Sequence, residues 1–377
     1  MLLAIDEQNK KILAEHATKE QNYRCPSCKN PLILKQGKIV TTHFAHYPAK
    51  KCFSFSEGES MDHIEGKKLL FRWLSSHYST VELEAFLPQI QQRPDLYFEN
   101  ERKDKVCVEF QCSKLSSDEM LKRTLSYQRH NYSVWWILGP NSALKQDKIS
   151  ALQKLFVFPS HLGLSIARLN IFKEHLELIN DFGYSSKEKL NWTETNFSLE
   201  NSSPDLIFTQ NPEAGQLKKF KRTDYLYTHH KYMKQIKYKN KNLLSLVEKL
   251  YRNRESLHTV SYLIYQSINY EWMIRNHPME WKYDVLQIIN KLPEAHIFSR
   301  KEFLTYIKEL KLKYYDMPLV QDNMRTTVLF FFLDFLCLEG ILTEINSNTW
   351  RKNKSVISYS NEGEKIKHLY LLSQQLC

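Results

Sequence analysis

The sequence predicts a mixed α/β fold in which helices flank a central β-sheet. Residues 60–78 and 116–130 have the apolar spacing of amphipathic helices. Residues 134–138 are wholly apolar, as is expected of a buried central strand. Between the two helices, alternating runs indicate three further strands, at 81–86, 95–98 and 106–112. The predicted order is therefore helix, three strands, helix, strand.

The length and charge of the chain indicate several domains and a polyanionic partner. A chain of 377 residues exceeds one ordinary domain. The formal charge is +11, and residues 216–254 hold 12 basic against 2 acidic residues. This imbalance favours a nucleic acid as partner. We expect four parts: an N-terminal segment (1–56), the α/β domain (57–158), an extension and linker (159–215) and a basic, mainly helical region (216–377).

The N-terminal segment contains the ligand types of a zinc site. A hairpin is expected from residues 1–5 and 11–14, and a CxxC turn follows it. Such a turn supplies two of the four ligands of tetrahedral zinc from one loop. The second pair is expected among two histidines and a third cysteine. The candidate zinc ligands are Cys25, Cys28, His43, His46 and Cys52. Unligated surface cysteines and a redox pair are the alternatives.

The first residues lack the basic flank and apolar core of a secretory signal. The longest apolar run, residues 328–338, is broken by Asp334 and is too short to cross a bilayer. Seven cysteines, three of them clustered, favour reduced thiols and metal binding over disulfides. We therefore expect a cytoplasmic protein without membrane contact.

Two carboxylates on neighbouring strands suggest a site for phosphodiester cleavage. Asp95 follows Pro94 at the start of one predicted strand, and Glu109 lies within the next. Side chains alternate along a strand, so Gln111 faces the same way as Glu109. Hard cations such as Mg²⁺ or Mn²⁺ prefer oxygen ligands, and the carbonyl of Phe110 is a further donor. A turn residue and an exposed strand residue are the alternative interpretations of the two acids.

The helix before these strands offers three more polar side chains. Glu59, His63 and Lys67 are spaced four apart, so they share one face of the predicted helix. Glu59 or His63 could bind the metal through water or act as a base. The alternative is a solvated helix face. Lys67 and Lys114 are the lysines that could supply a positive charge near the site.

The C-terminal half carries a basic, aromatic segment and a predominantly helical remainder. We expect a helix over 145–158, a strand pair from 164–170 and 176–182, and a linker over 183–215. Cations interleaved with tyrosines suit a nucleic-acid backbone with stacked bases, although a solvated helix face would look similar. Near the end, helices at 301–310 and 324–338 and strands at 342–346 and 356–359 resemble a winged helix. Its hairpin tip would carry Arg351, Lys352 and Lys354, and a plain helical bundle is the alternative.

These motifs resemble those of the competence protein CoiA family from the N-terminus to about residue 138. The matching residues are Cys25, Cys28, His43, His46, His63, Lys67, Arg93, Pro94, Asp95, Glu109, Phe110, Gln111, Cys112, Ser113, Arg123 and Tyr127. The resemblance implies a PD-(D/E)xK nuclease fold, with the order αβββαβ, behind a zinc-finger-like segment. It also implies a role in natural transformation, acting on incoming DNA during recombination.

The residue patterns and the resemblance together assign roles to the candidate residues. Asp95 and Glu109 would bind Mg²⁺ or Mn²⁺, with Glu59, His63, Lys67 and Gln111 completing a catalytic site for a metal-dependent deoxyribonuclease. Gln111 stands where the fold commonly has lysine, and a neutral amide cannot offset the charge of a hydroxide. The residues expected to contact DNA are Arg93, Arg123, Tyr127, Lys218, Lys219, Lys221, Arg222, Lys234, Lys237, Lys239 and Lys241.

Two other functions are compatible with the sequence. One is a catalytically inactive scaffold that binds single-stranded or branched DNA and delivers it to recombination proteins. The other is a zinc-finger regulator of transcription, although a single knuckle offers little readout of bases.

Overall fold

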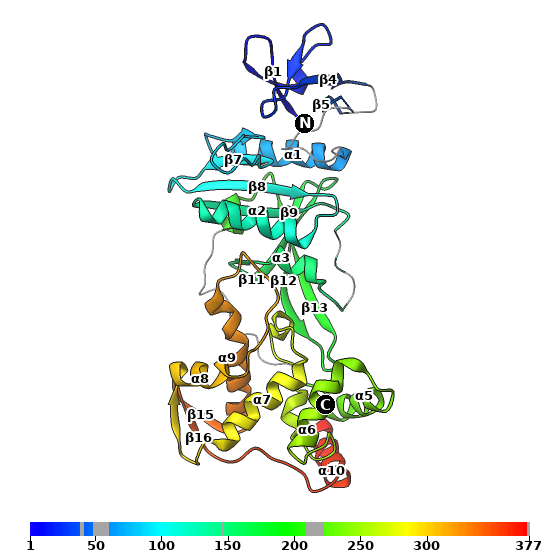
Figure 1. Ribbon diagram of the computed structural model, residues 1–377, viewed down its shortest axis with the longest axis vertical. Helices are drawn as coiled ribbons and strands as arrows, with labels where there is room; N and C mark the ends of the chain where they lie inside the picture. Colours follow the sequence, from blue (N-terminus) through cyan, green and yellow to red (C-terminus); the bar gives the residue numbers. More distant parts are fainter. Residues whose placement is uncertain (38–40, 48–59, 143, 145–146, 209–221, 375–377) are drawn as a thin grey trace.

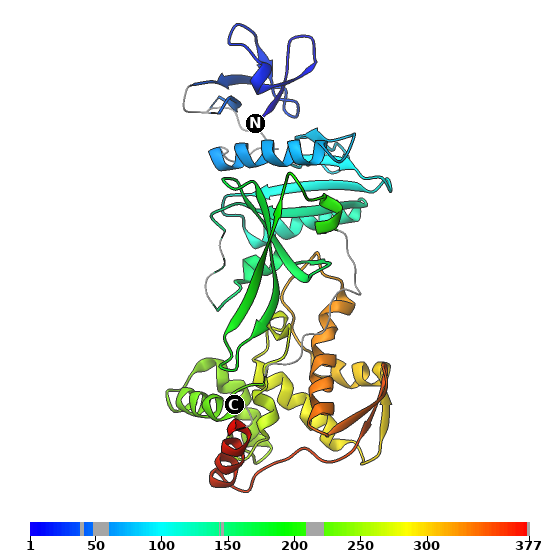
Figure 2. The ribbon, with the colours of Figure 1, turned by 180° about the vertical axis from the view of Figure 1, so that it is seen from behind.

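The computed structural model describes residues 1–37, 41–47, 60–142, 144, 147–208 and 222–374. The molecule is elongated (Figures 1 and 2). A small N-terminal module lies at one end, the central sheet follows it, and a helical region lies at the other end. Among the described residues, no helix has the length and apolar character needed to cross a bilayer.

The N-terminal module is an antiparallel sheet with a small core. Its strands follow the order β2-β1-β3-β4-β5. Their bounds are β1 (Leu3–Ile5), β2 (Lys11–Leu13), β3 (Tyr23–Arg24), β4 (Pro31–Lys35) and β5 (His43–His46). The predicted hairpin is confirmed as β1 and β2. The buried core around Tyr23 and Phe44 is small, so a bound metal would add substantially to its stability.

The central domain has the predicted order of helix, three strands, helix and strand. Its elements are α1 (Met61–Ser75), β6 (Glu82–Leu83), β7 (Leu96–Glu99), β8 (Lys105–Gln111), α2 (Ser117–Arg129) and β9 (Tyr132–Leu138). Strands β6, β7 and β8 are antiparallel, whereas β9 is parallel to β8 because α2 forms the crossover between them. Strand β6 is shorter than predicted: Glu84 has a φ of 49°, which takes the chain out of the extended conformation.

The two helices cover opposite faces of this sheet (Figure 1). Val108 and Phe110 of β8 pack in the cluster that includes α1, whereas Cys107 packs with Tyr127 of α2. Helix α1 lies so close to β8 that a Cβ atom on Gly66 would be 2.0 Å from the ring of Phe110. Glycine at this position therefore sets the distance between α1 and the strand that carries Glu109.

The sheet extends well beyond the nuclease-like order to eight strands. The added elements are α3 (Ala151–Leu155), β10 (Phe158–Ser160), β11 (Gly163–Asn170), β12 (His175–Tyr184), β13 (Leu190–Ser198) and α4 (Pro204–Phe208). The strand pair β11 and β12 is confirmed. The predicted helix over 145–158 is too long, since among residues 147–158 only α3 is α-helical.

The linker predicted over 183–215 is wrong for its described part. Strand β13 pairs with β12 along most of its length, and Ile207 and Phe208 of α4 are buried in the core. This strand lies at the edge of the sheet, and Leu190 is its one buried residue. An exposed edge strand needs few apolar residues, so its polar composition resembled that of a linker.

The C-terminal region is mainly helical, as expected. Its helices are α5 (Tyr225–Lys237), α6 (Leu244–Arg252), α7 (Pro278–Lys291), α8 (Arg300–Lys308), α9 (Asp322–Leu338) and α10 (Glu362–Gln374), with 3-10 turns at Lys241–Leu243, Tyr262–Tyr265 and Glu271–Met273. A three-stranded sheet of order β14-β16-β15 accompanies them. Its strands are β14 (Ile297–Ser299), β15 (Leu342–Asn346) and β16 (Thr349–Lys352).

The hairpin that we assigned to the winged-helix motif is placed differently in the structure. The second strand is β16, and residues 356–359 form no strand. Lys352 is 2% exposed and donates to the carbonyls of Asn290 and Leu292 at 3.0 and 2.5 Å. Because this lysine is buried, the expected basic tip does not form as predicted.

Candidate active site

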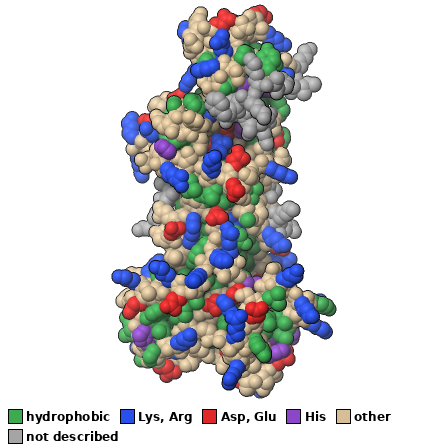
Figure 3. Space-filling model, in the orientation of Figure 1, with side chains coloured by type: hydrophobic (Ala, Val, Ile, Leu, Met, Phe, Trp, Pro, Cys, Tyr) green, Lys and Arg blue, Asp and Glu red, His purple; other side chains and the backbone are tan. Residues whose placement is uncertain are grey.

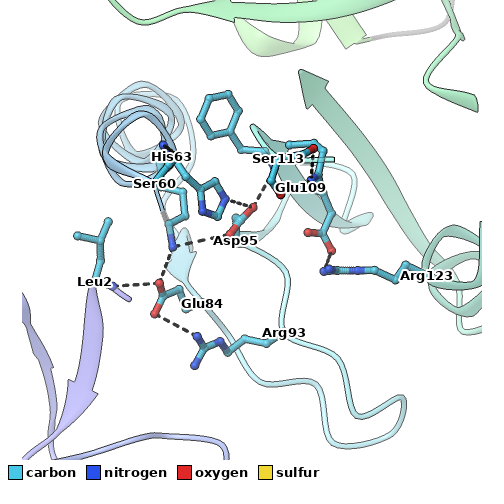
Figure 4. Close-up of polar contacts among 12 residues, drawn as sticks. Leu2, Ser60, His63, Glu84, Arg93, Asp95, Glu109, Ser113 and Arg123 are labelled. Carbon is cyan, nitrogen blue, oxygen red and sulfur yellow. Dashed lines mark hydrogen bonds and ion pairs between the residues drawn. The ribbon is translucent and has the colours of Figure 1, made fainter. Parts of the chain in front are cut away.

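Asp95 lies at the start of β7 and is contacted from two sides (Figure 4). Its Oδ2 atom is 3.2 Å from Nε2 of His63 on α1, and it accepts the backbone N–H of Phe110 on β8 at 2.9 Å. Burial alone would raise the pKa of this carboxyl, but His63, Lys67 and the Phe110 N–H together hold it below its ordinary value. Asp95 is therefore an anion bridging helix α1 and strand β8.

Lys67 is the second helical residue at the site. Its side chain is fully buried, with Nζ 3.8 Å from Oδ1 of Asp95 and 2.6 Å from Oε1 of Glu84. His63 and Lys67 thus reach Asp95 from one face of α1, as their spacing predicted. Glu59 lies outside the described residues, and Lys114 is exposed on the loop after β8.

Glu84 is a functional candidate that the sequence did not reveal. It is 2% exposed and accepts the backbone N–H groups of Leu2 and Leu3 at 3.0 and 3.3 Å, besides the contact from Lys67. Arg93 lies 3.7 Å from its other oxygen. Burial alone would raise the pKa of Glu84, but the charges of Lys67 and Arg93 outweigh this effect and lower it. Its alternating sequence context looks like that of an ordinary strand residue, so no local signal distinguishes it.

Glu109 is buried on the α2 side of the sheet. Its Oε1 atom accepts hydrogen bonds from the guanidinium of Arg123 and from the hydroxyl of Tyr127, the latter at 2.5 Å. Burial, reinforced by the nearby charge of Asp95, outweighs these partners and raises the pKa of Glu109 to about 7. Leu96 is paired with Val108, so Asp95 and Glu109 occupy facing positions of neighbouring strands. The structure thus brings the two predicted carboxylates into electrostatic contact.

Gln111 is turned toward the loop after β8. Its Nε2 atom donates to the carbonyl and the hydroxyl of Ser113 at 3.0 and 3.1 Å. The amide of Gln111 is therefore hydrogen-bonded to Ser113, and the positive charge near Asp95 comes from Lys67 on α1.

Two of the residues expected to contact DNA are buried. The side chain of Arg93 is 1% exposed, and Tyr127 is fully buried against Glu109. Direct contact with a phosphate is incompatible with these positions, so that prediction is wrong for both residues. Arg93 instead contacts Glu84, and Tyr127 donates a hydrogen bond to Glu109. Arg123 is 30% exposed and is paired with Glu109.

The basic segment of the C-terminal region is only partly a free surface. Among its described cations, Lys234, Lys237, Lys239 and Lys241 are exposed at the end of α5 and beyond it. Arg222 is paired with Glu339 at 3.1 Å. Lys218, Lys219 and Lys221 lie outside the described residues. Figure 3 shows Lys and Arg side chains at this end of the molecule, interspersed with acidic ones.

The tyrosines of this basic segment are likewise partly buried and partly exposed. Tyr225 and Tyr232 are buried in the core, whereas Tyr238 and Tyr251 are 71% and 83% exposed. Tyr225 and Tyr232 lie on the core face of α5, whereas Tyr238 follows α5 and Tyr251 lies on α6. Only part of the aromatic pattern is therefore exposed.

The cysteine and histidine side chains of the N-terminal module converge. The Sγ atoms of Cys25 and Cys28 and one ring nitrogen of His46 lie within 4.8 Å of one another, and Cys28 Sγ is 3.4 Å from His46 Nε2. This donor set suits zinc. His43 lies three positions before His46 on β5, hence on the other face, and its Nδ1 is 2.8 Å from the carbonyl of Thr41. Its proposed role as ligand is therefore not supported, and Cys52 lies outside the described residues.

Replacing Cys28 by serine is expected to abolish tight zinc binding at this module and to destabilise its five-stranded sheet. The reason is that a module with so small a core depends on the metal for its stability. Elemental analysis of the full chain and hydrogen exchange of the module measure the two effects. Serine replacement of Cys337 on α9, outside the cluster, is the matched control. Unchanged zinc content in the Cys28→Ser variant would contradict the assignment.

The protein has an extended β-sheet, two helices on its opposite faces and a buried pair of carboxylates. It is therefore an α/β protein with a nuclease-like domain. Residues 59–212 match the family model described as "Competence protein CoiA, nuclease-like domain", and residues 5–55 match "Competence protein CoiA, N-terminal domain". The chain belongs to the competence protein CoiA family.

Two curated relatives share part of this region. The competence protein CoiA of Bacillus subtilis (strain 168) is 33% identical over 147 residues, which are 39% of this chain and 37% of that protein. The Druantia protein DruB of Escherichia coli (strain UMEA 4076-1) is 42% identical over 53 residues, which are 13% of this chain and 10% of DruB. The matches thus span about a third and a tenth of the lengths of these relatives.

Proposed function

We propose that this protein acts on incoming DNA during natural transformation and that its central domain is a PD-(D/E)xK-type, metal-dependent deoxyribonuclease. The competence family, the nuclease-like domain and the αβββαβ order of elements support this proposal. The observation that carries it is Lys67: its buried ammonium group lies 3.8 Å from Asp95. A cation from α1 thus supplies the charge that Gln111 lacks.

The carboxylates provide hard oxygen donors that fit Mg²⁺ or Mn²⁺. Asp95 and Glu109 would hold the cation, with the carbonyl of Phe110 as a third donor. A bound divalent cation would activate water and stabilise charge on the phosphate oxygens. The pKa of Glu109 is raised because this carboxylate is buried and Arg123 and Tyr127 compensate its negative charge only in part. Such a group favours a further cation.

The other roles at the proposed active site belong to side chains of the protein. His63 is held beside Asp95, where it can orient the carboxylate or take a proton from a water molecule. Lys67 offsets the negative charge of a hydroxide formed beside Asp95. Glu84 positions Lys67 through a 2.6 Å ion pair. Zinc at Cys25, Cys28 and His46 would stabilise the module whose backbone N–H groups contact Glu84.

A non-catalytic scaffold that delivers DNA to recombination proteins is the second candidate. The ion pair between Arg123 and Glu109 favours it, because this contact already partly neutralises one proposed metal ligand. The exposed lysines at the end of α5 would serve either function. A winged-helix-like unit formed by α7, β14, α8, α9, β15 and β16 would add to DNA binding. In both cases we propose a cytoplasmic site of action.

The test is cleavage by the purified full-length chain of single-stranded, duplex and branched DNA with Mg²⁺ or Mn²⁺. Asp95→Asn should remove cleavage while DNA affinity stays close to that of the wild type. Binding without cleavage of any substrate would favour the scaffold. Absence of both cleavage and binding would contradict both candidates.

Replacing Lys234, Lys237, Lys239 and Lys241 by glutamine is expected to weaken DNA binding by a similar factor for every sequence. Each lost phosphate contact removes about 0.7 from the slope of log affinity against log salt for single strands. Affinity measured at several salt concentrations tests this. A variant with glutamine at Lys19, Lys103, Lys105 and Lys173, exposed lysines outside the C-terminal region, controls for net charge. An equal loss of slope in that control would contradict a specific surface at α5.

A further inference from the structure

Three side chains of types that can bind a metal, from distant parts of the sequence, meet in the C-terminal region. They are His229 on α5, His258 on the loop after α6, and Glu362 at the first position of α10. Glu362 Oε1 lies 3.1 Å from Nδ1 of His258 and 3.7 Å from Nε2 of His229. One ligand atom from each residue lies within 4.8 Å of the other two. The elements that carry them lie side by side in both ribbon views (Figures 1 and 2).

Both histidine nitrogens that face Glu362 lack a well-formed hydrogen bond among the described residues, and both atoms are buried. A buried polar atom without such a bond is costly, and native structures contain few of them. A bound ion is one of the ordinary reasons for this arrangement. The two nitrogens belong to the same cluster and face the same carboxylate oxygen at 3.1 and 3.7 Å, an arrangement that a shared metal ion would explain.

The ring of His229 is held in the orientation that a ligand needs. Its Nδ1 lies 2.9 Å from the hydroxyl oxygen of Tyr265, and the side chain is fully buried. When Nδ1 carries the ring proton, Nε2 presents its lone pair to His258 and Glu362. Metal-bound histidines are commonly fixed in this way through their second nitrogen.

Lys365 fixes the three segments relative to one another. Its side chain is buried one turn after Glu362 on α10, and it donates to the carbonyls of Leu257 and Val260 at 2.7 and 2.8 Å. These carbonyls flank His258. The same ammonium group donates to the hydroxyl of Tyr265 at 3.1 Å. The loop, the final helix and the residue that orients His229 are thus joined before any ion binds.

We propose that His229, His258 and Glu362 form a second zinc site, separate from the N-terminal cysteine cluster. Two imidazoles and one carboxylate form a ligand set for Zn²⁺, and water can complete the tetrahedron. Bonds of about 2.0–2.1 Å in a tetrahedral site place ligand atoms roughly 3.3 Å apart. The two distances to Glu362 lie on either side of that value, and the two histidine nitrogens lie within 4.8 Å of each other.

Zinc at this position would join the start of α10 to α5, whose far end carries the exposed lysines. The ion would thus fasten the last helix of the chain against the proposed DNA-binding helix. This site requires neither the nuclease chemistry nor DNA binding, so its test is independent of the function proposed above.

Zinc content of the metal-stripped, full-length chain after equilibration with Zn²⁺ measures the site directly. Excess Mg²⁺ is included so that the carboxylates of the central domain do not take up zinc. The Glu362→Gln variant should bind one zinc fewer per chain than the wild type. Because Glu362 is half-exposed, the substitution is not expected to disturb folding. Tyr265→Phe should weaken affinity by about 10–100-fold through loss of the bond that orients His229.

Glu248→Gln, an exposed glutamate on α6, is the matched control and should keep the wild-type zinc content. Co²⁺ distinguishes the two sites, since thiolate ligands give a charge-transfer band that a histidine and carboxylate site lacks. Protection of residues 353–361 from proteolysis by Zn²⁺, lost in Glu362→Gln, would further support the proposal. Equal zinc content in wild type and Glu362→Gln would overturn it and leave the cluster as an ion pair of Glu362 with His258.

Discussion

Replacing Glu109 by glutamine should lower the rate of metal-dependent DNA cleavage by at least about 100-fold while leaving DNA affinity nearly unchanged. The substitution keeps the size and shape of the side chain but removes the negative charge that would hold the cation. Loss of one well-placed electrostatic group at an active site typically costs about 10²–10³ in rate. Single-turnover cleavage at saturating protein measures the chemical step separately from DNA binding.

The amide of the Glu109→Gln variant can still accept hydrogen bonds from Arg123 and Tyr127, so the fold should persist. Glu119→Gln, an exposed position on α2, is the matched control and should cleave at the wild-type rate. Unchanged cleavage in Glu109→Gln would exclude this residue as a metal ligand. Wild-type transformation efficiency in cells carrying Glu109→Gln would show that the role of the protein does not depend on catalysis there.

Replacing Lys67 by methionine should both destabilise the protein and abolish cleavage. Methionine fills a similar volume but leaves Glu84 buried with only part of its positive surroundings. Breaking a buried ion pair by removing one partner costs about 3–5 kcal/mol. Arg93 and the N–H groups of Leu2 and Leu3 still contact Glu84, so we expect about 3 kcal/mol. Chemical denaturation measures this loss of unfolding free energy.

The double variant Lys67→Met/Glu84→Gln separates the two effects. Removing both charges should restore part of the lost stability, since no uncompensated carboxylate then remains buried at this position. Cleavage should stay absent, because the cation beside Asp95 is still missing. Lys68→Met, one position along α1, is the control and should behave like the wild type. Normal cleavage by the stable double variant would show that Lys67 serves stability alone.

Local sequence patterns were sufficient for much of the central domain. The apolar spacing of α1 and α2 and the wholly apolar β9 follow from burial on one or both faces of a sheet. Helix α2 begins after Ser116, whose hydroxyl accepts the N–H of Glu119, and serine is one of the preferred residues at this position. Beyond this domain, β13 was misread because an exposed edge strand can be polar.

The roles of individual site residues required the tertiary structure. Tyr127 and Arg93 match the family motif, but whether such side chains face DNA or a buried carboxylate depends on packing between elements distant in sequence. Glu84 joins α1 to the first residues of the chain, and His229 meets Glu362 across 133 positions. The periodicity of apolar residues shows which side chains share a face of one helix or strand. It gives no information about contacts between elements that are distant in sequence.

The sequence by itself determined the order of the central elements, the pair of acids on neighbouring strands, and the shared helix face of His63 and Lys67. These features depend on the 3.6- and 2-residue repeats of helix and strand. The tertiary structure alone decided which cation serves Asp95. Gly66 allows α1 to pack closely on β8, and this packing places Lys67 beside Asp95. Gln111 brings no charge to the site, so the ammonium group of Lys67 supplies it, held between the carboxylates of Glu84 and Asp95.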